Sequence, residues 1–117
     1  METVPFYDVG GSLPVSLDVF RNRPCALPFG HAAYISPTPH EVDRLIKLAG
    51  WSQSAVARLV GVTYNPKKGS STIRKWRADR DKDDYREIPY SAWRLMLLYA
   101  GVVSIEDGLA ANIDTTV

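Results

Sequence analysis

Helix start and stop signals follow one another closely between residues 38 and 61 of this chain. Thr38 and Glu41 have the T-x-x-E spacing of a capping box, and Pro39 stands where proline is tolerated, at the first helical position. Gly50 supplies the stop. Between these signals, apolar residues recur at the i, i+3, i+4 and i+7 spacing of one helix face: Val42, Leu45, Ile46 and Ala49. The pattern predicts an amphipathic helix.

Two further helices are indicated downstream. Ser52 is a candidate cap for a helix over residues 53–60, which Gly61 ends. The polar stretch TYNPKKGSS then separates this helix from a third, over residues 72–77, which Ser70 or Ser71 caps. The sequence therefore predicts a series of short helices rather than one long one.

The fourth predicted helix is almost entirely apolar. Ile88-Pro89 precedes it, Tyr90 or Ser91 caps it, and it runs to Ala100 with Arg94 as its exception. A helix that is apolar all round is buried on several sides, and in so small a chain a second subunit is expected to cover one of them. A last short turn of helix is expected near the group Ser104, Glu106 and Asp107.

The first 37 residues differ from the rest because five prolines exclude long helices there. Leu13, Val15, Leu17 and Val19 alternate with other residues, which fits either a short half-buried strand or an extended arm lying on the core. The chain is accordingly divided into a proline-rich N-terminal arm at 1–37, a helical domain at 38–111 and a frayed tail at 112–117.

Charge is unevenly distributed, although the net charge of the 117 residues is only +1. Residues 58–86 hold nine basic and four acidic side chains, whereas residues 87–117 hold one basic and four acidic ones. A basic segment of this kind suits a polyanion bound on one face, and it equally suits an ordinary solvated surface.

Several classes of protein are excluded. No apolar run approaches the roughly 20 residues that span a bilayer, and the start METVPFYDVGG lacks the pattern of a secretory signal. Cys25 is the single cysteine, and with His31 and His40 it makes a poor metal-ligand set. We find no catalytic constellation and expect neither an enzyme, a cofactor nor a metal. The expected location is the reducing cytoplasm.

Residues 53–77, QSAVARLVGV followed by a loop and STIRKWR, resemble the helix-turn-helix of Cro/C1-type (xenobiotic-response-element-like) regulators. Ala57 suits a close helix crossing, and Gly61 accepts the positive φ of the turn. The resemblance covers about residues 38–101, and the plan is similar to that of small phage and mobile-element autorepressors such as anti-CRISPR-associated regulators. The other residues that carry it are Gln53, Val62, Ile73 and Trp76. One departure is a loop lengthened by residues 64–69.

The resemblance implies a fold and a function. The fold is mainly α, a repressor-like helix-turn-helix domain of four to five helices with an extended or short-β N-terminal arm. The implied function is that of a transcriptional regulator, a repressor, which binds double-stranded DNA sequence-specifically. Because one helix reads only a few base pairs, a homodimer on a palindromic operator is expected.

Candidate DNA contacts gather between residues 67 and 77, where five side chains are basic and none is acidic. Arg74 and Lys75 are the expected base readers, beside the short hydroxyls of Ser70, Ser71 and Thr72. Phosphate contacts are expected from Gln53, Lys67, Lys68 and Arg77. The alternative is a protein–protein interaction adaptor with the same helical core and no DNA binding. Binding to random DNA fragments and its salt dependence separate the two.

Overall fold

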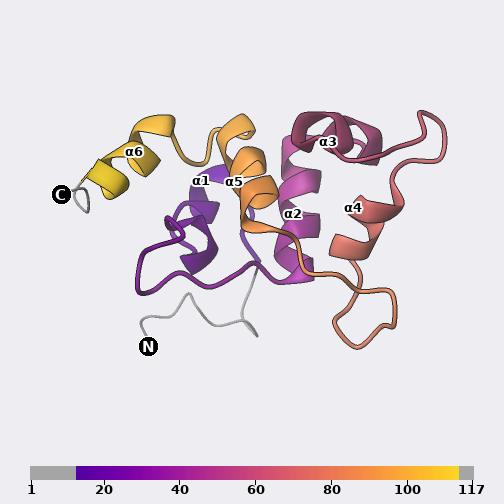
Figure 1. Cartoon of the computed structure of the whole chain (residues 1–117), viewed down its shortest axis with the longest axis horizontal. Helices are drawn as coiled ribbons and strands as arrows, with labels where there is room; N and C mark the ends of the chain where they lie inside the picture. The colour runs from indigo at the N-terminus through magenta and orange to yellow at the C-terminus, as the bar shows by residue number, and fades with distance from the viewer. Residues whose placement is uncertain (1–12, 114–117) are drawn as a thin grey trace.

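The computed structural model describes the backbone of residues 13–113 and the side chains of residues 13–109. Within this range the chain is helical, and its only β-type pairing is an isolated bridge between Asn65 and Gly69. The predicted mainly α fold is confirmed (Figure 1). The elements are α1 (Leu17–Phe20), the 3-10 turn η2 (Pro24–Ala26), α2 (Pro39–Ala49), α3 (Gln53–Val60), α4 (Ser71–Trp76), α5 (Tyr90–Tyr99) and α6 (Ile105–Ile113).

The predicted boundaries of α2 are confirmed by its caps. The Thr38 hydroxyl accepts a hydrogen bond from the Glu41 N–H at 3.1 Å, and the Glu41 carboxylate accepts one from the Thr38 N–H at 2.8 Å. Gly50 ends the helix in the left-handed conformation, with φ of 76°. These reciprocal bonds satisfy backbone donors that a helix start otherwise leaves unpaired.

Helix α3 also begins and ends at its predicted signals. Ser52 accepts a hydrogen bond from the Ala55 N–H at 3.1 Å, and Gly61 has φ of 83°. Ala57 is fully buried in the middle of the helix, and α3 packs against both α4 and α5. The small side chain expected at a helix crossing is therefore where the fold needs it.

Helix α5 supplies much of the core. Trp93, Met96 and Leu97 are fully buried, so part of the apolar excess predicted for a second subunit is absorbed within the chain. The helix ends in five apolar residues, 95–99. Of these, Leu95 and Leu98 are half-buried, and only Tyr99 is exposed. The remaining core residues include Phe20, Val42, Leu45, Ile46, Val56, Ile73, Trp76, Ile88 and Val102.

The strand alternative for residues 13–19 is wrong. Ser16 caps α1 by accepting a hydrogen bond from the Val19 N–H at 3.3 Å, and Phe20 is fully buried beside the Trp93 ring, with centroids 6.1 Å apart. Burying this large aromatic ring outweighs a weak alternation of apolar residues. Arg21 Nε also donates to the Val102 carbonyl at 2.9 Å, which ties α1 to the chain after α5.

The domain boundaries at 1–37, 38–111 and 112–117 remain predictions. Residues 1–12 of the arm and 114–117 of the tail lie outside the described residues, whereas 112–113 belong to α6. Helix α6 runs well beyond the single turn expected from the sequence. The described part of the arm joins the same core as the helices, since Trp93 Nε1 donates to the Cys25 carbonyl at 2.8 Å.

Candidate nucleic-acid interface

Helix α4, the candidate recognition helix, is short and firmly seated. Ile73 is fully buried and Trp76 is 5% exposed, so one face of the helix belongs to the core. Both residues are among those that carry the helix-turn-helix resemblance. The opposite face carries Ser71 and Arg74, which are exposed, while Thr72 and Lys75 are half-buried.

Ser70 holds the start of α4. It is only 3% exposed; its hydroxyl donates to the Thr63 carbonyl at 2.7 Å and accepts from the Ile73 N–H at 3.3 Å. Both bonds stabilise the first turn of the helix. Ser70 is therefore the N-cap of α4, and its predicted DNA contact stays a prediction.

Gln53 is likewise engaged within the fold. Its side-chain oxygen accepts a hydrogen bond from the Ser70 N–H at 3.0 Å, which connects the first residue of α3 to the start of α4. Gly69 packs so closely against this amide that an added Cβ would collide with it, and its φ is +93°. The left-handed backbone favours glycine here, and a larger residue would also displace the Gln53 amide from its bond to Ser70.

The loop that lengthens the helix-turn-helix is itself folded. We call residues 61–70 the α3–α4 loop. The backbones of Asn65 and Gly69 exchange hydrogen bonds of 2.7 and 2.8 Å, and the Asn65 side-chain oxygen accepts from the N–H groups of Lys67 and Lys68 at 2.9 and 3.0 Å. Ser54 donates to the Asn65 carbonyl at 3.1 Å and fastens this turn to α3. The two lysines are thus presented on a fixed backbone.

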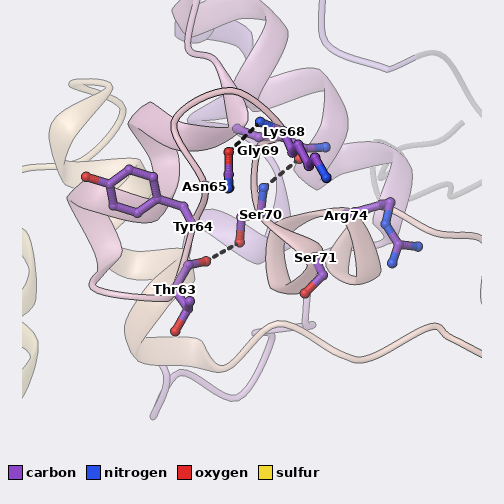
Figure 2. Close-up of a pocket in the computed structure, with 9 residues that line it drawn as sticks. Thr63, Tyr64, Asn65, Lys68, Gly69, Ser70, Ser71 and Arg74 are labelled. Atoms are coloured by element: carbon purple, nitrogen blue, oxygen red, sulfur yellow. Dashed lines mark hydrogen bonds between the residues drawn. The ribbon is translucent and has the colours of Figure 1, made fainter.

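A groove of about 570 Å³ separates this loop from α4. Lys68 lines it from the loop, and Ser71 and Arg74 line it from the helix (Figure 2). Tyr64 also lines the groove, and the guanidinium carbon of Arg58 lies 5.7 Å from the centroid of the Tyr64 ring. The arrangement brings together Lys68, Ser71 and Arg74, which come from two different parts of the predicted site.

Arg77 differs from the other predicted cations because it is used in the fold. It is held by Asp43 of α2 through Nε at 2.7 Å and through a second nitrogen, with side chains 21% and 28% exposed. Lys47 contacts the same carboxylate at 2.8 Å. Burial opposes the charged form of Asp43, but the bonds from Lys47 and Arg77 outweigh burial and hold the pKa of Asp43 below its usual range. The ion pair joins α4 to α2, and the phosphate contact of Arg77 stays a prediction.

Arg74 also has an acidic neighbour. Its Nη1 donates to Asp84 at 2.7 Å, and this bond holds the pKa of the Asp84 carboxyl below its usual range. Both side chains remain largely exposed, so the arginine keeps access to solvent. By contrast, no ion pair between described residues involves Lys67 or Lys68.

Sequence reasoning missed Asn65, Asp84 and Asp43 as residues that shape this site. The Asn65-Pro66 pair with Gly69 four residues later is a turn signal that points to an ordered loop. Asp84 and Asp43 leave no comparable local signal, because their partners lie ten and 34 residues away.

Three further features of the described residues concern metal ligands, the Cys25 thiol and helix length. Residues 13–113 hold no group of three or more His, Cys, Asp or Glu side chains placed to bind a metal ion. Burial, followed by the Glu41 carboxylate, raises the pKa of the Cys25 thiol well above its usual value. None of the described helices is long and apolar enough to cross a membrane.

Relatives with a described role point to one class of protein. Two that match this chain are both transcriptional repressor protein KorC from Escherichia coli. One is 31% identical over 75 residues, which cover 64% of this chain and 79% of the relative. The other is 35% identical over 69 residues, which cover 59% of this chain and 72% of the relative. The chain belongs to the KorC family of transcriptional repressors.

No protein-family model matches the chain, and no solved structure matches it. Membership of the KorC family supports the predicted class, a transcriptional regulator rather than an enzyme. The narrower resemblance to Cro/C1-type regulators stays a prediction, as do the individual DNA contacts.

Proposed function

We propose that this KorC-family chain is a transcriptional repressor that binds double-stranded DNA sequence-specifically through α4 and the α3–α4 loop. The observation that carries the proposal is the shared groove of Lys68, Ser71 and Arg74, in which a cation from the loop and a cation from the helix flank a short hydroxyl. Long cations reach base edges and phosphates, and short polar groups let a helix approach the bases closely. The name of its relatives supports repression.

Within this proposal, the residues fall into three roles. Arg74 and Lys75 read base edges, with Ser71 and Thr72 beside them. Lys67 and Lys68 bind phosphates from the fixed turn of the loop. The third role is structural: Gln53, Ser70 and Arg77 hold the two helices at a set angle through hydrogen bonds and an ion pair.

The Cro/C1-type resemblance supplies the docking geometry of the proposal. In that geometry α3 crosses the DNA backbone and α4 enters the major groove. Two observations support this geometry: α3 and α4 pack against each other, and Ala57, Ile73 and Trp76 are buried. The lengthened loop then stands beside α4 and reaches the flanking phosphates.

We further propose a homodimer on a palindromic operator, because a helix as short as α4 reads too few base pairs alone. The proposed dimer surface is an apolar groove of about 330 Å³ between α5 and α6, lined by Leu95, Leu98, Tyr99, Val103, Ser104 and Ile105. Tyr99 and Ile105 are 58% and 65% exposed, and α6 lies at the end of the molecule opposite α4 (Figure 1). Each copy would therefore keep its α4 free for DNA.

A repressor of this kind acts in the cytoplasm of a bacterium that carries it on a chromosome, phage or mobile element.

Selection of bound duplexes from a random DNA pool tests the function directly. We expect the purified chain to enrich one motif with two-fold symmetry and to bind it with an affinity that falls steeply with salt. The expected companion result is that the chain represses a reporter whose promoter contains the motif. A chain that enriches no motif at low salt contradicts the proposal and favours the protein-interaction adaptor instead.

A further inference from the structure

The segment that follows α4 returns to the helix and is fastened there. After Arg77 the chain turns back on itself before it runs on to α5 (Figure 1). The Arg86 N–H donates to the Lys75 carbonyl at 3.2 Å, so the returning backbone is bonded directly to α4. We call residues 79–84 the acidic loop, since four of its six residues are aspartates.

This return places one aspartate of the acidic loop on the candidate base reader. Asp84 lies 2.7 Å from Nη1 of Arg74, with the two side chains 44% and 55% exposed. A guanidinium has five N–H donors in a fixed planar fork, and Asp84 occupies only one nitrogen. The remaining donors stay available to a base edge.

Such a pair affects two kinds of DNA complex differently. On a cognate base, an arginine that is already oriented loses less side-chain freedom when it forms two parallel hydrogen bonds. On unrelated DNA, the same arginine would act mainly through attraction to phosphates. The Asp84 charge weakens that attraction, because it neutralises Arg74 and repels the phosphates itself.

We infer that Asp84 is a specificity-determining residue, which orients Arg74 for a base edge and weakens binding to non-cognate DNA. The inference rests on the proposed function, since it needs Arg74 to contact a base. It assigns the acidic loop a part in recognition, beyond that of a solvated acidic segment.

The test compares Asp84→Asn with Asp81→Asn in the full-length protein. Both substitutions remove one negative charge from the same exposed loop, but among the described residues only Asp84 pairs with Arg74. Affinity is measured for the duplex selected by the wild type, for its single-base variants and for a scrambled duplex, each at several salt concentrations. Circular dichroism checks that both variants stay folded.

We expect Asp84→Asn to bind the scrambled duplex several-fold more tightly than Asp81→Asn does. It should also lose about fivefold or more of the preference at one base position, the lower end of what a good bidentate contact supplies. In an Arg74→Ala background, Asp84→Asn should leave base preference unchanged, because its effect acts through that arginine.

Three results separate the possible failures. If the two single variants raise all affinities equally, Asp84 acts only through net charge and the inference is wrong. If Asp84→Asn strengthens binding to the selected and scrambled duplexes alike, Asp84 is a simple competitor of DNA, which also overturns it. If the wild type selects no duplex, the proposed function itself fails and the inference falls with it.

Discussion

Arg77, the residue that ends α4, forms an ion pair with Asp43 in the middle of α2, 34 positions earlier in the chain. The ion pair joins the candidate recognition helix to the helix that precedes the helix-turn-helix. Because both side chains are largely shielded from water, removing one partner leaves the other charge poorly solvated. The contact therefore contributes to the stability of the fold.

The first prediction concerns this pair. Arg77→Met should lower the free energy of unfolding by about 1–3 kcal/mol, since it removes charge-assisted hydrogen bonds to Asp43. Lys47→Met is the matched control: Lys47 is 66% exposed and binds the same carboxylate, and its loss should cost about 0.5 kcal/mol or less. Urea denaturation of both variants measures the difference. Equal costs would show that the Arg77 contact is no stronger than a surface pair.

The second prediction is a pH dependence of stability. The pKa of Asp43 is lowered in the folded chain, so the unfolded state takes up a proton first as the pH falls. The stabilisation is then complete above the ordinary aspartate pKa of about 3.9 and is lost as the pH falls through the lower folded value. The stability difference between wild type and Asp43→Asn should accordingly shrink between about pH 5 and pH 2. A difference that stays constant over this range contradicts the assignment.

The third prediction concerns Trp76. Because this side chain is 5% exposed, Trp76→Ala should lower the free energy of unfolding by roughly 3–5 kcal/mol, a large share of the stability of a small domain. Thermal melting followed by circular dichroism measures the loss. A variant with unchanged melting and reduced DNA affinity would instead make Trp76 a contact residue.

The fourth prediction concerns the oligomer. The chain should be a dimer at micromolar concentration, and Ile105→Glu should shift it to the monomer because a charge at this 65% exposed apolar site opposes burial. Leu109 on α6 is also exposed but does not line the groove, so Leu109→Glu serves as the comparison. Sedimentation equilibrium gives the masses. If the wild type has the monomer mass of 13.0 kDa at every concentration, the proposed dimer is wrong.

The ends of α2 and α3 could be predicted because their signals are local. Thr38, Gly50, Ser52 and Gly61 each act on backbone groups within a few residues, so their effect is visible in the sequence itself. Helix α1 has one such local signal, the Ser16 cap, but it is only four residues long and was not predicted. Phe20 of this helix packs against Trp93, and a contact between residues 73 positions apart leaves no local signal in the sequence.

The candidate site was predictable in position and less so in detail. The cluster of basic residues at 67–77 indicated where the candidate site lies. Charge alone does not reveal which of these side chains form ion pairs within the fold. Arg77 and Arg74 have carboxylate partners that tertiary structure brings to them, and Gln53 has a backbone partner 17 residues away. Lys67 and Lys68 differ because their turn is stabilised locally by Asn65.

The most direct test of the account is the affinity of Arg74→Ala and Lys68→Ala for the selected duplex and its single-base variants across a range of salt concentrations. Arg74→Ala should flatten the preference at one position, worth about 1–3 kcal/mol of discrimination. Lys68→Ala should weaken binding to all sequences equally and reduce the salt slope by about one unit, as loss of one phosphate contact does. If instead Arg74→Ala keeps the full base preference while Lys68→Ala abolishes it, the α3–α4 loop reads the sequence and α4 is not the recognition helix.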